Sequence, residues 1–385
     1  MRCRRRHFYR YSSLIKGNAG LYLHFPFCNG KCDYCSFYSV VPSNSLVDSY
    51  TDALLNEIAK CSKEFDDKKF DTVFIGGGTP SLISDSNAEK IFSALFSHFD
   101  ISENAEFTTE ANPESLTDGY LSTFVKYGGN RLSLGVQSLC DKECLAVGRR
   151  TDKEKVFSAI ELAKKHGIKN ISCDLILGLP DQTKESLFYS IDTLLDQDIK
   201  HLSLYSLKID KGTPLYTKKD ILSFPDDDAE FELYHSAVIH LASCGLKRYE
   251  ISNFALPDFE SKHNLKYWNQ DEYLGLGPAA HSFMNGKRFY NESDLKKYVG
   301  GNCRVYDNDG DIEANSVEER LMLSLRTQKG FPVCDFPNHS VHSVSLLHKQ
   351  LISHGLAENN GEYVILTDSG LWVMNEIILR FIELI

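Results

Sequence analysis

Six apolar runs of strand length recur along the first half of the chain, and a segment with helical periodicity follows each run. The runs are Leu21–Phe25, Asp71–Ile75, Glu106–Glu110, Arg131–Val136, Ile171–Leu177 and Leu202–Leu207. In the first helical segment, Val47, Tyr50, Leu54 and Ile58 recur three and four residues apart, which marks one buried helix face. Strands that alternate with helices predict a parallel sheet with right-handed crossovers. Six units are two short of a closed eight-fold barrel, so we expect an α/β fold, a partial (β/α)6 barrel.

Changes in pattern divide the 385-residue chain into four segments. A basic extension occupies residues 1–20, and the barrel occupies residues 21–250. Its last part contains the turn Phe224–Ala229, whose acidic residues start a helix that runs to about Gly245. Residues 251–310 are rich in Asn, Gly, His and aromatic residues and are expected to form irregular loops with short elements. Residues 311–385 read as a separate domain.

The C-terminal domain is expected to resemble a winged helix. Ser316–Glu319 is a capping box that starts a helix, and Gly330 stops that helix. A second helix is predicted near Ser343–His354, and Asn360 with Gly361 predicts a hairpin turn between Leu356–Glu358 and Tyr363–Leu366. The domain has ten acidic and five basic residues. This charge favours a module that contacts protein or acts as a lid over one that reads DNA.

Three cysteines lie within eight residues: Cys28, Cys32 and Cys35. A [4Fe–4S] cluster usually takes four thiolates, so this loop would leave one iron open for a substrate, as catalytic metal sites do. A zinc site would need a fourth ligand, usually from a second pair that does not follow here. A disulfide would leave one thiol over, and a chance run of cysteines is the remaining alternative. The spacing favours the cluster.

Composition limits the cellular setting and the partners. The chain has eleven cysteines, an odd number, and carries no secretory signal, which predicts a cytoplasmic protein whose other thiols are mostly free. Its formal net charge of −11 disfavours nucleic acid as a partner, because phosphate binding needs a basic face. No apolar stretch approaches the length that spans a membrane.

The basic N-terminal extension has several interpretations. No Asp or Glu precedes Asp33, and Met1–Arg10 is rich in arginine. A transit peptide or a peripheral contact with an anionic membrane surface would have this charge. A disordered tail or an upstream start codon explains it more simply, because the extension is short and lacks an amphipathic repeat.

Polar residues follow the predicted strands where each one ends. In parallel barrels these C-terminal ends carry the active site. The candidates are the glycine-rich run Gly76–Pro80 together with Glu110, Gln137, Arg149 and Asp174. Glycines let the backbone approach a ligand closely, although the same run also suits a tight turn. A carboxylate in an apolar strand needs a partner. These side chains therefore either bind a ligand or pair with one another in a structural network.

The order of these segments resembles one branch of the radical S-adenosylmethionine (SAM) superfamily. That branch comprises oxygen-independent coproporphyrinogen III dehydrogenase and its relative, the heme chaperone HemW, and the resemblance covers about Leu21 to Phe283. It implies that the amino and carboxylate groups of SAM chelate the open iron. By motif, the residues at SAM-contacting positions are Tyr22, Gly77, Gly78, Thr79, Glu110, Gln137, Arg149 and Asp174, and Tyr34 lines the adenine site.

Two features separate the members of this branch. The dehydrogenase pattern places a fourth cysteine two residues after the third, where this chain has Phe37. The run Lys262–Trp268 matches the HNxxYW motif of HemW, in which the histidine is implicated in heme binding. The resemblance thus implies a heme site that comprises His263, Asn264, Tyr267 and Trp268, with His281 as the alternative ligand. From the residues alone, a local hydrogen bond of the histidine and a seam filled by aromatic rings are the simpler interpretation.

Three functions follow from these patterns. The first is a heme chaperone on a radical SAM scaffold, which binds a [4Fe–4S] cluster, SAM and heme and passes heme to an acceptor protein. The second is coproporphyrinogen III dehydrogenase, an enzyme of porphyrin metabolism, against which Phe37 argues. The third is a radical SAM enzyme with an unrelated substrate, which the barrel pattern alone does not exclude. The sequence names no acceptor and leaves open a homodimer.

Overall fold

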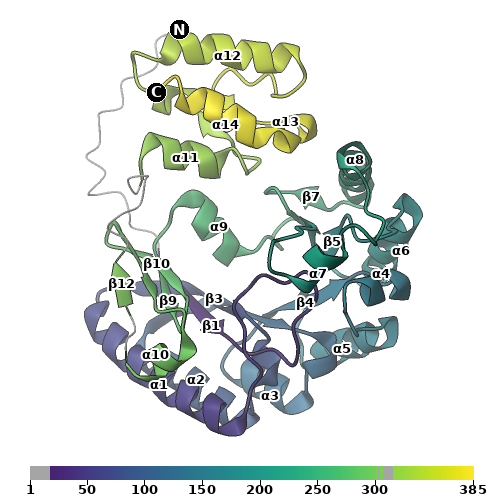
Figure 1. Cartoon of the computed structure of the whole chain (residues 1–385). Helices are drawn as coiled ribbons and strands as arrows, with labels where there is room; N and C mark the ends of the chain where they lie inside the picture. The colour runs from purple at the N-terminus through teal and green to yellow at the C-terminus, as the bar shows by residue number, and fades with distance from the viewer. Residues whose placement is uncertain (1–17, 302–303, 307–314) are drawn as a thin grey trace.

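Six parallel strands form the wall of a partial barrel in the computed structural model, which describes residues 18–301, 304–306 and 315–385. They follow one another in the sheet in chain order, and Figure 1 shows them in the lower body of the molecule. Their bounds are Ala19–Phe25 (β1), Lys69–Gly77 (β2), Asp100–Ala111 (β3), Arg131–Gln137 (β4), Asn170–Leu177 (β5) and His201–Ser206 (β6). The expected partial barrel is confirmed. Most of the N-terminal extension, residues 1–17, lies outside the described residues.

Further strands extend this sheet at both edges, where the sequence pattern predicted mainly irregular loops. Beyond β1 the order continues with β9, β10, β11 and β12, and beyond β6 it continues with β8 and β7. Their bounds are Lys247–Arg248 (β7), Asn253–Ala255 (β8), Tyr273–Leu276 (β9), His281–Met284 (β10), Lys287–Asn291 (β11) and Arg304–Tyr306 (β12). Strand β9 runs parallel to β1, while β10, β11 and β12 pair antiparallel to their neighbours. These strands are too short for a period of two to mark them in the sequence.

Helices cover the outer face of the barrel (Figure 1). In α1, the predicted face of Val47, Tyr50, Leu54 and Ile58 is buried, and the side chain of Ser43 caps the helix by accepting from the N–H of Leu46. The helices of the barrel region are Asn44–Glu64 (α1), Asp85–His98 (α2), Asp118–Lys126 (α3), Asp141–Ala146 (α4), Lys153–Lys165 (α5), Lys184–Leu195 (α6), Pro214–Lys218 (α7), Asp227–Ser243 (α8), Lys262–Asn269 (α9) and Leu295–Val299 (α10). In the described ranges, no helix is both long and apolar enough to cross a membrane.

The C-terminal domain is helical and has a hydrophobic core of its own. Its elements are Val317–Ser324 (α11), Phe331–Pro332 (β13), Val341–Ser353 (α12), Tyr363–Val364 (β14), Asp368–Trp372 (α13) and Met374–Ile382 (α14). Ser316 caps α11 as predicted, but the helix ends at Ser324, before Gly330. Ala357 bridges Leu366 across the predicted Asn360 turn. The pairing around this turn is therefore hairpin-like but short.

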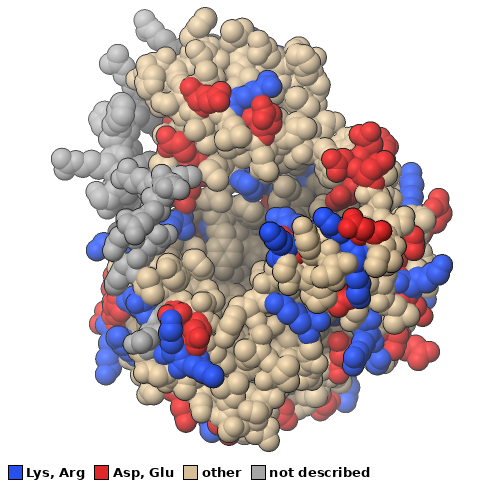
Figure 2. All heavy atoms as spheres, viewed as in Figure 1, with Lys and Arg blue, Asp and Glu red and all other residues tan. Residues whose placement is uncertain are grey.

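The C-terminal domain packs above the barrel, with α9 between them in Figure 1. Gln328 donates its N–H to the carbonyl of Tyr249 at 3.2 Å, and Arg248 forms a partly buried ion pair with Asp368. Trp372 stands edge-on against Phe231 at 5.5 Å between ring centroids. Figure 2 shows a hollow on this face between the two bodies.

Candidate functional site

The cysteine loop and the glycine-rich loop are hydrogen bonded to each other at the C-terminal ends of β1 and β2. Gly78 donates its N–H to the carbonyl of Phe25 at 2.6 Å, and Thr79 donates to the carbonyl of Phe27 at 2.7 Å. A Cβ atom at Gly78 would lie 2.5 Å from the Phe27 oxygen, inside van der Waals contact. The close approach of the two loops therefore requires glycine at this position.

The three cysteines lie on one short loop whose backbone is hydrogen bonded to its neighbours. Cys28 donates its N–H to the carbonyl of Val40 at 3.1 Å, and Cys35 donates to that of Cys32 at 3.1 Å. All three thiols are half-buried and free. The sulfur of Cys28 lies 3.5 Å from the hydroxyl of Thr79, a residue at a predicted SAM position.

The spread of the thiols fits a cluster better than a single metal ion. Tetrahedral zinc with Zn–S bonds of about 2.3 Å would hold sulfur atoms about 3.8 Å apart. Among the described residues, the only group of three or more such ligands lying within 4.8 Å of one another involves other side chains, so at least one pair of these sulfur atoms stands further apart than 4.8 Å. A loop that spreads its sulfur atoms in this way can reach separate irons of a [4Fe–4S] cluster.

Arg149 links the cysteine loop to two strands of the barrel. Its guanidinium donates to the sulfur of Cys32 at 3.6 Å, to the side-chain oxygen of Asn112 at 2.8 Å and to the carbonyl of Gly135. The side chain is buried. Arg149 therefore holds the cysteine loop against the C-terminal ends of β3 and β4.

Glu110 lies at the end of β3 and supports the glycine-rich loop. Its carboxylate accepts from the N–H of Gly77 at 3.0 Å, and a Cβ at Gly76 would lie 2.8 Å from it. Enclosure in the barrel, and then the charge of Asp174, raise the pKa of Glu110 to about 8. The carboxyl therefore holds a proton at neutral pH until a hydrogen-bond donor or a positive charge binds beside it.

Asp174 faces the interior of the barrel from β5. The hydroxyl of Ser133 donates to its carboxylate at 3.2 Å, and burial raises its pKa. Tyr22, Glu110 and Asp174 line a cavity of about 360 Å³. Asn264 and Tyr267 from α9 form another part of the same wall. The structure thus brings three predicted SAM residues and two predicted heme residues to one cavity.

The other six predicted SAM residues do not line this cavity: Tyr34, Gly77, Gly78, Thr79, Gln137 and Arg149. Gln137 ends β4 at a bulge and has a φ of 72°, a left-handed conformation that is uncommon for residues other than glycine. Tyr34 is packed by an apolar cluster that includes Val147, Leu179 and Leu215. Gln137 therefore holds a strained backbone conformation, whereas Tyr34 anchors the cysteine loop, of which it is part, on this apolar cluster.

His263 is fully buried, and both of its ring nitrogens have partners. Nδ1 lies 2.8 Å from the hydroxyl of Thr72, and Nε2 lies 2.8 Å from that of Tyr267. The ring stacks on Phe74 at 5.2 Å between centroids. Burial lowers the pKa of His263 to about 3. In this conformation the imidazole cannot reach heme iron, so the predicted ligand would become available only if α9 moved.

Helix α9 is anchored to the barrel at further points. The carboxylate of Glu106 on β3 accepts from the N–H groups of Lys262 and His263 at 3.1 and 3.0 Å. Lys266 pairs with Asp71 on β2 at 2.7 Å. Both contacts would have to break before α9 could release His263.

The other two predicted heme residues face different surroundings. Trp268 is half-buried and lines a cavity of about 440 Å³ between α9 and the C-terminal domain, with Arg320 and Lys329. His281 is exposed at the start of β10, and its ring stacks on Tyr290 at 5.3 Å. Because β9 runs parallel to β1, the chain turns from β9 toward His281 at the edge where the cysteine loop lies. His281 is the accessible histidine of the two.

Sequence reasoning missed His24, which lies on β1 between the predicted cavity residues and the glycine-rich loop. Its Nδ1 lies 2.9 Å from the hydroxyl of Tyr22, and a Cβ at Gly77 would lie 2.5 Å from its ring. Burial lowers its pKa to about 4, and its Nε2 has no hydrogen-bond partner. Its position two residues after Tyr22 was the available signal, because alternate residues of a strand share one face.

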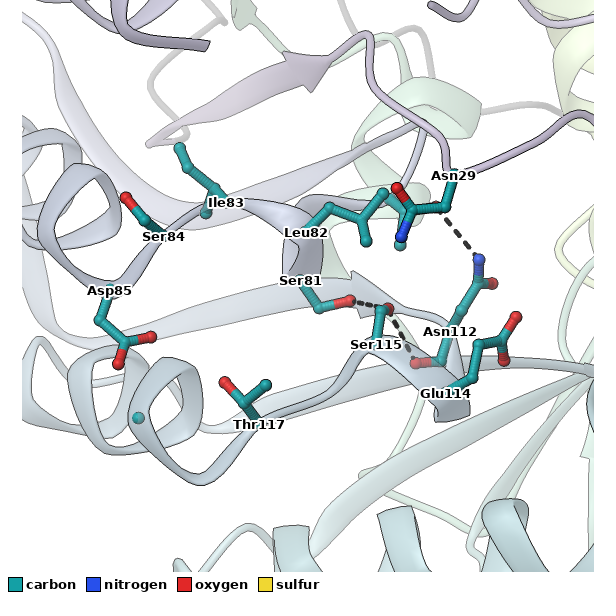
Figure 3. Close-up of a pocket in the computed structure, with 12 residues that line it drawn as sticks. Asn29, Ser81, Leu82, Ile83, Ser84, Asp85, Asn112, Glu114, Ser115 and Thr117 are labelled. Carbon is teal, nitrogen blue, oxygen red and sulfur yellow. Dashed lines mark hydrogen bonds between the residues drawn. The ribbon is translucent and has the colours of Figure 1, made fainter. Parts of the chain in front are cut away.

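Figure 3 shows a larger cavity of about 590 Å³ outside the barrel interior, beside the cysteine loop. Asn29 contributes to it from that loop, and Glu114 contributes from the turn after β3. Ser81 and Ser115 are hydrogen bonded across its floor at 2.6 Å. Of the predicted SAM residues only Thr79 lines it. The smaller cavity in the barrel, where the carboxylates gather, is therefore the stronger candidate site.

Comparison with known proteins agrees with this geometry. Residues 22–194 match the model of the radical SAM superfamily. The chain is 32% identical to the heme chaperone HemW of Lactococcus lactis, over 94% of this chain and 96% of that protein. It is 34% identical to HemW of Bacillus subtilis, over 94% and 98%.

A solved structure shares the fold at lower identity. The coproporphyrinogen III oxidase HemN of Escherichia coli superposes with a TM-score of 0.79 at 22% identity, over 94% of this chain and 90% of that one. This likeness shows the fold alone. The relatives that match along nearly their whole length decide the family, and the chain belongs to the HemW family of radical SAM proteins.

Proposed function

We propose that this protein is a heme chaperone that binds a [4Fe–4S] cluster, SAM and heme and passes heme to an acceptor protein. The observation that carries this proposal is the shared wall of the barrel cavity. Tyr22, Glu110 and Asp174 meet Asn264 and Tyr267 of the HNxxYW segment there. The named function of the relatives, which span nearly this whole chain, supports the same proposal.

Cys28, Cys32 and Cys35 would hold the cluster, which when bound supplies an open iron for the amino and carboxylate groups of SAM. Arg149 donates to the sulfur of Cys32 and would hold this ligand in place. Glu110 would accept a hydrogen bond from the amino group of SAM, beside the N–H of Gly77 that it already accepts. The half-buried backbone of Gly77 and Gly78 would let the ligand approach without a Cβ in the way.

Heme would bind on the face where the barrel mouth meets the C-terminal domain. His281 is our proposed iron ligand, because it is exposed at the edge of the sheet where the cysteine loop lies and a neutral imidazole binds heme iron. His263 would instead hold α9 and Tyr267 in place, since both of its nitrogens are engaged. Trp268 offers flat apolar area near the seam between the domains.

The competing function is coproporphyrinogen III dehydrogenase, the other member of the branch that the motifs of this chain resemble. Phe37 stands where that enzyme's pattern has its fourth cysteine, and its side chain is 68% exposed on the cysteine loop. We expect no conversion of coproporphyrinogen III under anaerobic reducing conditions with SAM. Repeated turnovers in that assay would replace the chaperone proposal with the enzyme.

The test is a heme titration of anaerobically reconstituted protein, with and without SAM. We expect a saturable shift of the Soret band, followed by loss of heme to an added heme-free acceptor. Alanine at Cys28, Cys32 or Cys35 should remove most of the about four irons of a cluster, whereas Cys334→Ala, at an exposed cysteine elsewhere, should keep them. Full iron content in Cys32→Ala would refute the cluster, and the absence of a saturable heme signal would refute the chaperone.

A further inference from the structure

Helices α6 and α8 pack against each other on the outside of the barrel, at the right of Figure 1. Asp192 projects from α6, and His240 and Cys244 come from the last turn of α8 and its cap. None of these residues lines the barrel cavity or belongs to the cysteine loop. They form a separate cluster of three side chains, each of a type that can bind a metal ion.

The imidazole of His240 is held by two residues of α6. Its ring stacks on Phe188 at 4.3 Å between centroids and 12° between planes. Its Nε2 lies 2.5 Å from a carboxylate oxygen of Asp192. Phe188 and Asp192 are four residues apart and therefore lie on one face of α6. The ring is thus oriented by Phe188 and Asp192 before any ligand binds.

Cys244 completes the cluster from the same helix as His240. Four residues separate them, so both side chains face α6. The sulfur of Cys244, a ring nitrogen of His240 and a carboxylate oxygen of Asp192 all lie within 4.8 Å of one another. No other group of three or more such ligands is this compact in the part of the chain that the structure describes.

We propose that Asp192, His240 and Cys244 bind one zinc ion, with water in the fourth position. Imidazole, thiolate and carboxylate are the three side-chain ligands that zinc takes. Tetrahedral bonds of about 2.0 to 2.3 Å would set the ligand atoms about 3.3 to 3.6 Å apart. The side chains of His240 and Asp192 are 24% and 54% exposed, so small rotations can provide this spacing. The thiol proton of Cys244 leaves to solvent as the Zn–S bond forms.

The bound ion would have no net charge to bury, because one carboxylate and one thiolate balance Zn²⁺. It would tie α6 to α8 at a point where the described contacts are the hydrogen bond between His240 and Asp192 and a ring stack. An exposed polar contact of this kind contributes little by itself. Zinc would therefore stabilise this side of the barrel.

The same helix provides a matched control. His235 stacks on Phe231 at 13° between planes, and its Nδ1 lies 3.6 Å from a carboxylate oxygen of Asp368. This arrangement resembles that of His240 but has no cysteine among the described groups within ligand distance. If zinc needs the full set of three, His235 will not affect its binding.

The experiment is a competition titration of untagged, cluster-loaded protein with Zn²⁺ and a chromophoric chelator under anaerobic conditions. We expect one equivalent of tightly bound zinc. Cys244→Ser and His240→Gln should each weaken it more than about tenfold, the smallest loss that removal of even an outer-shell partner causes. Asp192→Asn should weaken it in the same direction. His235→Gln should bind zinc as the unaltered protein does, and iron content should stay constant in all four variants.

A second measurement follows the thiol itself. Zinc should protect Cys244 from alkylation, read by mass spectrometry, and should leave the exposed Cys334 reactive. Equal zinc affinity in the unaltered protein and Cys244→Ser would overturn the proposal. Equal alkylation of Cys244 with and without zinc, or the same loss of affinity in His235→Gln as in His240→Gln, would also overturn it.

Discussion

The Nε2 atom of His263 lies 2.8 Å from the hydroxyl oxygen of Tyr267, one turn further along α9. The other ring nitrogen is bonded to Thr72 on β2. The first and fifth residues of the HNxxYW run therefore form an internal link between α9 and the barrel. In this state Tyr267 lines the cavity, and His263 holds the hydroxyl of Tyr267 through a hydrogen bond. The link makes the histidine a structural element of the cavity wall, and this leads to the first prediction.

Replacing His281 with alanine should weaken heme binding at least about tenfold, or about 1.4 kcal/mol. His263→Ala should change heme affinity little. It should instead destabilise the fold by about 2–4 kcal/mol, because it leaves a cavity and unpairs Thr72 and Tyr267. Heme titration and chemical unfolding measure the two effects, with the exposed His339→Ala as the control. Loss of heme in His263→Ala alone would mean that α9 opens to expose that ring.

Burial of His263 should make stability depend on pH. Its pKa is about 3 in the folded protein and about 6.5 in an unfolded chain. Between these values the unfolded state binds more protons, so this histidine destabilises the fold as pH falls below about 6.5, by up to about 1.4 kcal/mol per pH unit. Carboxyl groups whose pKa is raised in the folded protein, such as Glu110 with a pKa of about 8, have the opposite effect and stabilise the fold as pH falls.

The contribution of His263 to the pH dependence of stability is therefore measured as the difference between the unaltered protein and a variant without this histidine. Urea unfolding from about pH 7 to about pH 5 should show the unfolding free energy of His263→Gln falling less with acidity than that of the unaltered protein. His354→Gln, at an exposed histidine, should leave the dependence unchanged. Parallel curves for His263→Gln and the unaltered protein would show that the ring is not buried in its neutral form.

Affinity for SAM should rise as pH rises from about 6 to about 8. The carboxyl of Glu110 has a pKa of about 8 and must lose its proton to accept fully from the amino group of SAM, so binding should improve by up to about tenfold per pH unit below that value. Equilibrium dialysis with the cluster-loaded protein measures it. Glu110→Gln should bind more weakly with a flatter dependence, whereas Glu103→Gln, exposed on the same strand, should behave normally. A pH dependence that is the same in both variants would argue against the role of Glu110.

Gly78→Ala should impair assembly of the cluster. The added methyl would lie 2.5 Å from the carbonyl oxygen of Phe27 and 2.8 Å from that of Phe25, so the two loops would have to separate. We expect iron incorporation to fall and the fold to lose about 1–3 kcal/mol, as overpacking does. Gly361→Ala, where a Cβ would meet nothing within 4 Å, is the control. Normal iron content in Gly78→Ala would show that the contact between the loops is dispensable.

The six barrel strands, the cysteine loop and the polar residues at the strand ends were all predictable from the sequence. Each depends on local signals, which are runs of apolar residues, the spacing of three cysteines and the glycines after β2. Such signals persist in the chain whatever its neighbours are. Helix α8 was predictable for the same reason, because its acidic start and capping residue lie within one turn.

Only the tertiary structure decided the state of the HNxxYW segment and the edges of the sheet. Strands β9 to β12 are three to five residues long, and long-range pairing defines them. A motif fixes which residue is a histidine, but burial and hydrogen-bond partners determine whether its nitrogens are free. For His263 those partners are Thr72, 191 residues away in the chain, and Tyr267, one helical turn away. Because packing between distant segments sets solvation, the sequence determined the chemistry available at the site, and the fold determined which groups can use it.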